Sequence, residues 1–519
     1  MAAPGAPAAS FRAVPYRGII TLCCMIGTLM QALDATIANV ALPYMQGSLS
    51  ATYDQITWVL TSYIIAAAIM TAPVGWLAAR FGRRNLFVVS LAGFTVTSML
   101  CGLAQSLGQI VIFRIAQGMF GAALVPLSQS IMLDIYPVER RGQAMAIWGM
   151  GVMVGPIMGP TLGGYLTEFY SWRWVFYVNV PFGIAAMLGL MFFMRRLRGN
   201  VSLRFDWLGF AVLALGIGAF QMMLDRGELK DWFGSAEIVT EATLAGIGFY
   251  LFIVHLLTAK KPFIPPALFH DVNFSASMLV MFSAGLVLVA SSALLAPYLQ
   301  ELAGYPVETA GLVLAPRGVG TLAAMMVAGR LADRTDPRIL MLIGVMLLEY
   351  SIWIMLGWTP DIAPRAVASA IVIQGAGLGL IFTPLQVMAF ATLPVAMRTD
   401  GASLLSLFRN FGSAIGVSIT SALLDRIGQV EHSALAGFVT PFRRLFENNP
   451  AIHHLLDPNT AAGAAALNQV INQQAQAIAY LADFKLMMLT TLPIIPLILI
   501  MRRRGHAAAL PAEHAAVME

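Results

Sequence analysis

Long apolar stretches alternate with short polar segments along most of this chain. A helix of about 20 apolar residues is long enough to cross the hydrocarbon core of a bilayer. We expect the first stretch to remain as a spanning helix, because it is too long for a signal peptide. The alternation predicts fourteen helices, near residues 18–40, 55–79, 86–104, 108–130, 143–166, 174–195, 206–224, 237–258, 275–299, 309–331, 338–357, 366–391, 402–424 and 485–501.

The composition supports a membrane protein and excludes several other classes. Hydrophobic residues make up 58% of the 519 residues and charged residues only 11%, which is about half the charged share of a soluble protein. The net charge of +5 comes from short basic clusters between apolar stretches, so it does not indicate nucleic-acid binding. No cysteine spacing suggests a metal site. The sequence has no phosphate-binding loop, which excludes ATP-driven transport, and no cofactor is expected.

Basic residues are concentrated on one side of the predicted helices. The loops after the first and third helices contain no Lys or Arg. By the positive-inside rule, both chain ends, residues 1–17 and 502–519, are expected in the cytoplasm. The basic residues on this side include Arg12, Arg17, Arg80, Arg83, Arg84, Arg140, Arg141, Arg195, Arg196, Arg198, Arg204, Lys260, Lys261, Arg334, Arg338, Arg398, Arg502, Arg503 and Arg504.

A short motif is repeated after the second and tenth helices. Residues 75–84 read GWLAARFGRR, and residues 329–334 read GRLADR. Matching motifs after corresponding helices indicate two homologous six-helix bundles, with two further helices inserted between them. The predicted divisions are a first bundle at 18–198, the inserted pair at 199–260 and a second bundle at 261–501.

One segment on the opposite side, residues 425–484, is too polar to span the membrane. Apolar and polar residues between Gln469 and Leu481 alternate as in an amphipathic helix. A docking element or cap is one interpretation, and a plain surface loop is favoured over it. The segment also holds His432, His453, His454 and Asp457, for which we favour a surface loop over a metal site.

Four further motifs follow in a fixed order: LDATIANVALP at 33–43, RIAQG at 114–118, GVMVGPIMGP at 151–160 and WRWVFYVNVP at 172–181. Together with the repeated loop motif, they resemble the major facilitator superfamily, and within it the fourteen-helix drug:proton antiporters of the EmrB type. The resemblance covers nearly the whole chain and implies an all-α polytopic fold. Ala79 stands where the first loop motif usually carries an acid, whereas the second copy keeps Asp333.

The resemblance also implies roles in gating for two sets of residues. The loop-motif residues are Gly75, Arg80, Gly82, Arg83, Asp333 and Arg334, and those of the antiporter motif are Gly151, Gly155, Pro156, Gly159 and Pro160. Glycines every four residues allow another helix to approach closely, and prolines can bend a helix. The glycine stripe therefore either seals or hinges the two bundles or is a simple packing seam, and the motif favours the first.

Two ionisable residues lie within the first bundle's apolar stretches. A charged group at the bilayer centre costs about 3 kcal/mol, so each needs a reason to be there. Asp34 could take up and release a proton in apolar surroundings, with Gln31 on its helical face. Arg114, with Gln117 one turn on, keeps its charge and would bias a nearby acid. We predict that Asp34 and Arg114 form one proton-coupling network in a central cavity; the alternative is a carboxylate satisfied structurally.

The second bundle carries its own polar residues. Glu349 is a second candidate proton site, although a structural role is at least as well supported. The predicted substrate cavity includes Gln31, Gln117, Gln374, Arg409 and Asn410. Arg317 and Gln386 also lie in apolar stretches, while Asp225 and Arg226 end the seventh helix.

The predicted function is proton-driven export of lipophilic drugs or toxic compounds across a bacterial inner membrane by alternating access. Export of an endogenous lipid, siderophore or metabolite is the alternative, and an intramembrane enzyme is a third possibility. The resemblance further implies contact with membrane lipid and, as partners, a periplasmic membrane-fusion adaptor and an outer-membrane channel.

Overall fold

The computed structural model is helical throughout the residues that it describes, which are 15–195, 199–200, 202–438 and 460–502. Within these residues, thirteen helices are long and apolar enough to cross a membrane. A fourteenth span is a pair, Asp54–Thr71 and Val74–Phe81, bent by 58°. Each predicted stretch falls on one of these spans, so the predicted all-helical membrane fold is confirmed.

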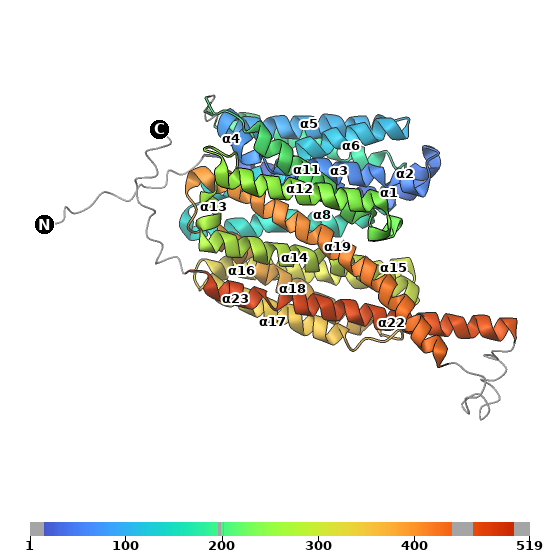
Figure 1. The fold of residues 1–519 in the computed structure, drawn as a ribbon. Helices are drawn as coiled ribbons and strands as arrows, with labels where there is room; N and C mark the ends of the chain where they lie inside the picture. The colour runs from blue at the N-terminus through green and yellow to red at the C-terminus, as the bar shows by residue number, and fades with distance from the viewer. Residues whose placement is uncertain (1–14, 196–198, 201, 439–459, 503–519) are drawn as a thin grey trace.

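The first ten α-helices pack together as the N-terminal bundle (Figure 1). Pro73, which has no backbone N–H to donate, lies at the break between α3 and α4. The helices are α1 (Arg17–Ser48), α2 (Tyr53–Ile56), α3 (Trp58–Thr71), α4 (Val74–Phe81), α5 (Arg83–Leu103), α6 (Leu107–Gly121), α7 (Leu124–Ile135), α8 (Arg141–Phe169), α9 (Trp174–Tyr177) and α10 (Asn179–Phe193).

The C-terminal bundle contains the helices from α13 to the end of the described chain. They are α13 (Ala267–His270), α14 (Val272–Pro297), the π-helical turn η4 (Tyr298–Leu302), α15 (Val307–Leu314), α16 (Pro316–Ala332), α17 (Pro337–Met355), α18 (Pro364–Ala389), α19 (Arg398–Gly437), α22 (Ala461–Thr491) and α23 (Ile494–Ile500). Both ends of the described chain lie at one end of the molecule, which we call the terminal end, and the opposite is the far end (Figure 1).

The two inserted helices are α11 (Trp207–Arg226) and α12 (Ala236–Thr258). α11 packs against α3 of the N-terminal bundle and α19 of the C-terminal bundle. Thr61 of α3 donates a hydrogen bond to Asp225 at the end of α11, and Phe411 of α19 lies edge-on to Phe220, with ring centroids 5.8 Å apart. The inserted pair therefore covers one of the two seams between the bundles.

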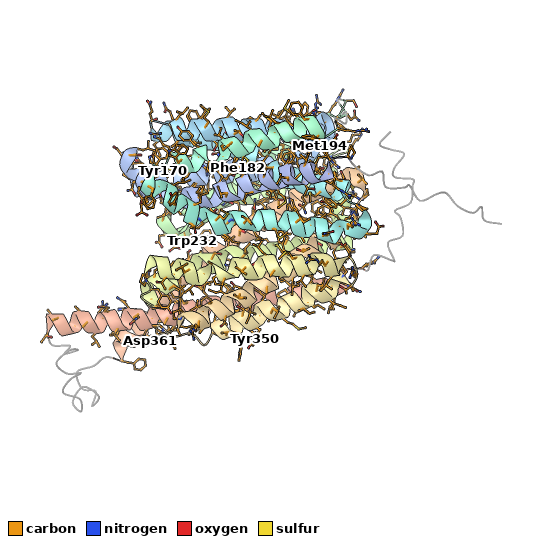
Figure 2. All side chains as sticks on the ribbon, turned by 180° about the vertical axis from the view of Figure 1, so that it is seen from behind. Tyr170, Phe182, Met194, Trp232, Tyr350 and Asp361 are labelled. Carbon is orange, nitrogen blue, oxygen red and sulfur yellow. The ribbon has the colours of Figure 1, made fainter. Side chains whose placement is uncertain are left out.

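The outer surface of the helices is apolar and crowded with large side chains (Figure 2). Phe192 is 78% exposed, Trp207 72% and Leu257 79%, which in water would be costly over so wide an area. Tyr170 and Trp232 lie at the far end and Met194 near the terminal end (Figure 2). This surface suits contact with lipid along the length of the spans.

The expectation of a surface loop at residues 425–484 is wrong for residues 425–437 and 461–484. α19 continues as far as Gly437, and α22 begins at Ala461, so both helices extend past the far end of the bundles (Figure 1). The predicted amphipathic helix is confirmed as part of α22, whose Ala475, Ala479 and Tyr480 are buried. Packing by the bundle overrides the polar pattern there. His453, His454 and Asp457 lie outside the described residues.

Candidate functional site

Asp34 of α1 and Arg114 of α6 form an ion pair inside the N-terminal bundle. The Arg114 Nη1 and Asp34 Oδ2 atoms are 2.6 Å apart, and both side chains are completely buried. The two residues are eighty positions apart and are brought together because α1 and α6 both pack into the same bundle. In this conformation the predicted pair lies between helices and is not exposed to a central cavity.

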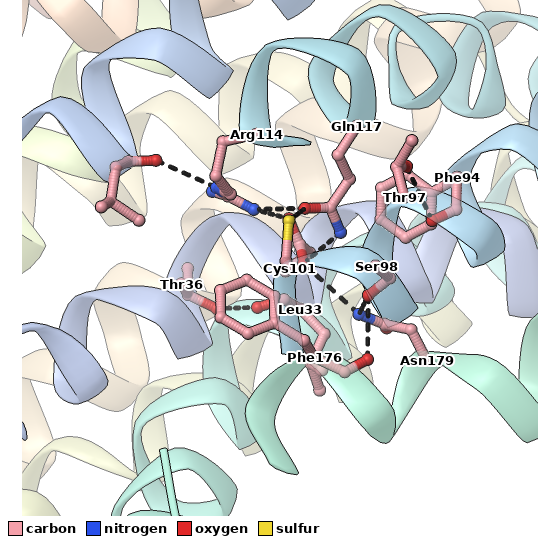
Figure 3. A network of polar contacts seen from close by, with 12 residues as sticks. Leu33, Thr36, Phe94, Thr97, Ser98, Cys101, Arg114, Gln117, Phe176 and Asn179 are labelled. Carbon is pink, nitrogen blue, oxygen red and sulfur yellow. Dashed lines mark hydrogen bonds and ion pairs between the residues drawn. The ribbon is translucent and has the colours of Figure 1, made fainter. Parts of the chain in front are cut away.

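Further polar groups complete the shell around this pair (Figure 3). Gln117 Nε2 and Asn179 Nδ2 donate to Asp34 Oδ1 at 2.9 and 3.3 Å. Arg114 donates to the carbonyl oxygen of Val59 at 2.9 Å, and its guanidinium lies 4.0 Å from the ring centroid of Tyr63. The Asp34 side chain therefore accepts hydrogen bonds from three donors, and the one from Arg114 is charge-assisted.

Two sequence expectations about this shell differ from the structure. Gln31 is half-buried one turn from Asp34, but the hydrogen bonds of Asp34 come from Arg114, Gln117 and Asn179. Asn179 was not predicted as a site residue. Its signal was an amide in the apolar part of the motif at 172–181, and this signal becomes clear only when α10 is placed beside α1.

The glycine stripe of α8 packs on α1, the helix that carries Asp34. A Cβ atom built on Gly155 would lie 2.6 Å from Ala32 Cβ, one on Gly159 would overlap Thr36 Oγ1, and one on Gly163 would lie 2.9 Å from Ile37 Cγ1. The stripe is thus a close-packing seam within the N-terminal bundle. In this conformation it does not itself form the contact between bundles, and Pro156 and Pro160 are exposed beside it.

Substituting Gly155 with alanine is expected to destabilise the protein by about 1–3 kcal/mol. The added methyl group would meet the backbone of Ala32 and Leu33 at 2.7 Å, and would push α1 away next to Asp34. Gly164 lies on the same helix, and a Cβ added there would have no atom within 4 Å, so Gly164→Ala is the matched control and should be neutral or slightly stabilising. Equilibrium unfolding in detergent micelles measures both, and equal stability of the two variants would contradict the seam.

A different face of α8 contacts the C-terminal bundle. A Cβ on Gly142 would lie 2.8 Å from Asp333 Oδ1, and one on Gly329 would overlap Ala146 Cβ. Trp148 of α8 and Phe382 of α18 stack with ring centroids 6.1 Å apart. α8 therefore touches the Asp34 helix on one side and the other bundle on another.

The repeated loop motif lies at the terminal end, where the bundles meet. Asp333 accepts from the backbone N–H groups of Gly142 and Gln143 at 2.8 and 3.3 Å, which satisfies donors in the first turn of α8. Gly75 leaves room for Asp400 of α19, because a Cβ there would overlap that carboxyl. Arg334 is exposed.

The other residues of the first motif tie neighbouring segments together. Arg80 donates to the carbonyl oxygen of Leu203, and Gly82 has a positive φ of 84° at the turn between α4 and α5, which favours glycine. Arg83 pairs with Asp134 of α7. Asp134 also pairs with Arg398 of α19 at 2.7 Å, so it bridges the two bundles.

Several hydrogen bonds join the two bundles in the terminal half of the molecule. They join Arg83 to Val395, Gln129 to Gln386, Ser130 to Thr399, Asp134 to Arg398, and Gly142 and Gln143 to Asp333. This conformation is therefore closed at the terminal end.

Substituting Asp134 with asparagine is expected to loosen that closure. The change removes the charge that holds Arg83 and Arg398, and a partly exposed pair is worth about 1 kcal/mol. Ser130 is buried at the interface, so a cysteine placed there reports on the closure. In the Asp134→Asn variant this cysteine should react with a membrane-impermeant maleimide, added from the terminal side, roughly fivefold faster than the same cysteine in a protein that keeps Asp134. Glu237→Gln is the control, because Glu237 of α12 pairs with Arg226 of α11, within the inserted helices. Unchanged labelling would show that Asp134 does not hold the closure.

In the C-terminal bundle the predicted residues fall in two places. Glu349 lies between α17 and α22, where Thr491 donates to it, away from the contact between bundles. Gln374 is completely buried on α18, while Arg409 and Asn410 are half-buried on α19. The structure therefore does not join Glu349 to the Asp34 network.

Three acids, two at the contact between the bundles and one in the interior, were not predicted from the sequence. Asp134 and Asp400 lie at the terminal-end contact. Asp483 is completely buried on α22, and neither of its carboxyl oxygens has a hydrogen-bond partner. Asp483 was hidden because the last span was predicted to begin two residues later.

At the far end, residues of η4, α19 and α22 line a polar cavity of about 570 Å³ that is open to the surface. It is lined by residues that include Glu301, Asp425, His432, Gln476 and Tyr480. His432 Nε2 lies 2.9 Å from Asn468 Oδ1. Among the described residues, no group of three or more His, Cys, Asp or Glu side chains could hold a metal ion.

Two helical bundles with matching loop motifs, a closed end and a buried ion pair define a polytopic membrane transporter. Comparison with known families agrees. The profile described as Major Facilitator Superfamily matches residues 24–417, and the chain belongs to that superfamily.

Several multidrug exporters are similar to this chain over most of its length. Multidrug export protein EmrB of Escherichia coli is 35% identical over 472 residues, covering 90% of this chain and 88% of that protein. EmrB of Haemophilus influenzae is 35% identical over 432 residues, covering 83% of this chain and 85% of that protein. Fatty acid resistance protein FarB of Neisseria gonorrhoeae is 34% identical over 458 residues, covering 88% of this chain and 90% of that protein.

Solved structures support the fold alone. The proton:xylose symporter XylE has a TM-score of 0.56 at 16% identity, with 91% of this chain and 95% of that chain covered. The human organic anion transporter MFSD10 has a TM-score of 0.58 at 13% identity, with 92% of this chain and 100% of that chain covered.

Proposed function

We propose that this protein is a proton-driven antiporter that exports lipophilic drugs or toxic compounds across the bacterial inner membrane, and that it is not an enzyme. The observation that carries the proposal is the buried ion pair of Asp34 and Arg114. A buried pair is an expensive way to gain stability, and intramembrane acids commonly mark proton pathways. The similarity to multidrug export proteins supports the cargo class.

In this proposal the terminal end is cytoplasmic, as the basic residues predict. The closed terminal end then corresponds to an outward-facing conformation. A proton that enters from outside binds a carboxyl oxygen of Asp34 and removes the attraction for Arg114. The guanidinium keeps its contacts with Val59 and Gln117, so α1 and α6 are free to shift relative to each other.

α8 connects the shift of α1 to the contact that closes the terminal end. It packs on α1 through Gly155, Gly159 and Gly163 and on the C-terminal bundle through Gly142 and Ala146. A displacement of α1 therefore moves α8, and with it the backbone N–H groups that bind Asp333. Opening of the terminal end would then expose Asp34 to the cytoplasm, release the proton there and admit the substrate.

Purified protein in liposomes tests the function directly. With an imposed pH gradient, a lipophilic dye should leave the compartment that represents the cytoplasm only while the gradient lasts, and a protonophore should stop it. Dye movement that does not depend on the pH gradient would contradict proton coupling. No dye movement, together with turnover of a lipid or peptide, would favour the intramembrane enzyme.

The cargo has one alternative. The alternative is an endogenous lipid, siderophore or metabolite, and the similarity to a protein named for fatty acid resistance supports the lipid among these. Growth of a deletion strain against a panel of drugs, fatty acids and siderophores separates these classes, because the strain becomes sensitive only to compounds that the protein exports.

A periplasmic membrane-fusion adaptor and an outer-membrane channel are proposed as partners, with α19 and α22 at the far end as the docking element. These helices extend past the bundles (Figure 1). Replacing residues 433–470 with a short linker should abolish co-purification of the adaptor and leave proton-driven efflux from liposomes intact. Retained co-purification would place docking elsewhere.

A further inference from the structure

Asp483 of α22 lies inside the C-terminal bundle without a partner for its carboxyl group. Its side chain is completely buried, and neither Oδ1 nor Oδ2 takes part in a hydrogen bond. No cation of the described residues lies within 4 Å of it. Lys485 is exposed and, two residues further on, points to another side of the helix. A carboxylate without water, counter-charge or hydrogen bond is very costly, so Asp483 holds a proton in this conformation.

The elements packed against α22 supply no fixed positive charge to Asp483. They are α14, α17, α19 and η4, and α14 contains no titratable residue. The titratable residues that face α22 from the others are Glu349 of α17, Asp425 and His432 of α19, and Tyr298 and Glu301 of η4. Glu349 at least accepts a hydrogen bond from Thr491, whereas Asp483 has none.

The far-end cavity approaches Asp483 along one face of α22. Asn472, Gln476 and Tyr480 line that cavity, and their spacing of four residues places them on one face of the helix. Asp483 is the next position on this face, about 4.5 Å further along the helix than Tyr480. Side chains on a helix lean toward its N-terminus. Because α22 begins at the far end (Figure 1), the carboxyl group of Asp483 leans back toward the cavity.

Tyr480 stands between Asp483 and the cavity. Its side chain is only 3% exposed, although it lines the cavity, and its ring lies edge-on to Tyr298 with centroids 5.2 Å apart. The Tyr480 hydroxyl makes no hydrogen bond among the described residues, and it is close enough to Glu301, Asp425 and Asp483 for the charge of each to act on it. This one hydroxyl therefore adjoins both the acids of the cavity and the buried acid.

We propose that Asp483 is a second proton-binding site of the transporter, filled from the far-end cavity past Tyr480. The described lining of this cavity contains Glu301 and Asp425 but no Lys or Arg, and a cleft of one charge sign concentrates ions of the opposite sign. A proton from water in the cavity binds one carboxyl oxygen of Asp483, neutralises it and allows it to stay buried. The inference rests on the proposed function for the direction of proton flow, and it adds a site separate from Asp34 of the N-terminal bundle.

Infrared difference spectroscopy of the purified full-length protein in detergent tests the site without transport. At pH 7 the spectrum of the wild type minus that of Asp483→Asn should contain the carbonyl stretch of one protonated carboxyl group, which shifts when H₂O is replaced by D₂O. Asp361→Asn is the matched control, because Asp361 is an exposed acid at the far end (Figure 2), and it should keep the whole band. Asp483→Glu should move the band without removing it, and serves if Asp483→Asn does not fold.

The rate at which the band shifts in D₂O tests the route. Tyr480→Phe keeps the ring against Tyr298 and removes the hydroxyl, so the band should stay at full intensity and shift at least about fivefold more slowly. Gln429→Cys that carries a bulky maleimide should also slow the shift, since Gln429 lines the cavity and the native cysteines are buried. Gln474→Cys with the same label is the control, because Gln474 is exposed on α22 outside the cavity lining.

Identical spectra of the wild type and Asp483→Asn would overturn the proton site. A band that belongs to Asp483 but shifts equally fast in Tyr480→Phe and in the labelled Gln429→Cys protein would overturn the route through the cavity. Dye efflux from liposomes is measured separately. If that efflux did not depend on the pH gradient while the Asp483 band was intact, the proposed function would fail and the proton site would stand.

Discussion

Asp34→Asn is expected to abolish proton-driven efflux while substrate exchange without a proton gradient continues. Asparagine keeps the shape and one acceptor oxygen of Asp34, but it cannot take up a proton. The cycle would therefore lose the step that alternately makes and breaks the contact with Arg114. Liposomes that contain equal amounts of folded variant and wild type give the measurement: uphill efflux should fall to background, and counterflow of labelled substrate should persist.

Two variants make this result specific. Asp231→Asn removes an acid from the turn beyond α11 at the far end and should leave efflux unchanged. Glu349→Gln tests the rival proton site between α17 and α22. If Asp34→Asn retained uphill efflux at normal protein levels while Glu349→Gln lost it, the coupling group would be Glu349.

The second large effect is expected on stability and concerns the same ion pair. Arg114→Gln should lower the free energy of unfolding by about 3–5 kcal/mol, because the completely buried carboxylate of Asp34 loses its counter-charge. Asp34→Asn leaves Arg114 unpaired and should cost a similar amount. The double variant has no buried charge at either position, so it should recover most of the loss.

Equilibrium unfolding in mixed micelles gives the four free energies of this double-mutant cycle. The double variant should be stable and still fail to couple efflux to protons, which separates the structural role of the pair from its role in transport. Additive losses would mean that the two charges do not depend on each other.

The apolar pattern predicted the spans well because crossing a bilayer imposes a length and a composition on each helix separately. It placed all fourteen near their observed positions, including the bent pair at Asp54–Phe81. The ion pair of Asp34 with Arg114 could also be predicted, since charges within apolar stretches need partners. Asn179 could not, because an amide at the start of α10 has no distinct signal until α10 lies beside α1.

The apolar pattern could not predict which helix packs against which, or the contacts that depend on this packing. Glycine spacing indicated close packing at Gly155 and Gly159, but only the structure identifies α1 as their neighbour. The role of Asp134 depends on Arg83 and Arg398, which come from different bundles. The polar stretch of α22 was taken for a loop because a helix that leaves the bilayer no longer needs apolar residues on every side.

The position of α11 and α12 has a consequence for how a lipophilic compound gets in. These helices cover the seam where α3 and α19 approach each other, whereas α8 and α16 pack directly against each other on the opposite seam. A molecule dissolved in one leaflet of the membrane therefore meets a barrier on one flank. Lateral entry is expected where the contact between α8 and α16 opens during the transport cycle, so that uptake from the bilayer is one-sided in a protein whose two bundles otherwise match.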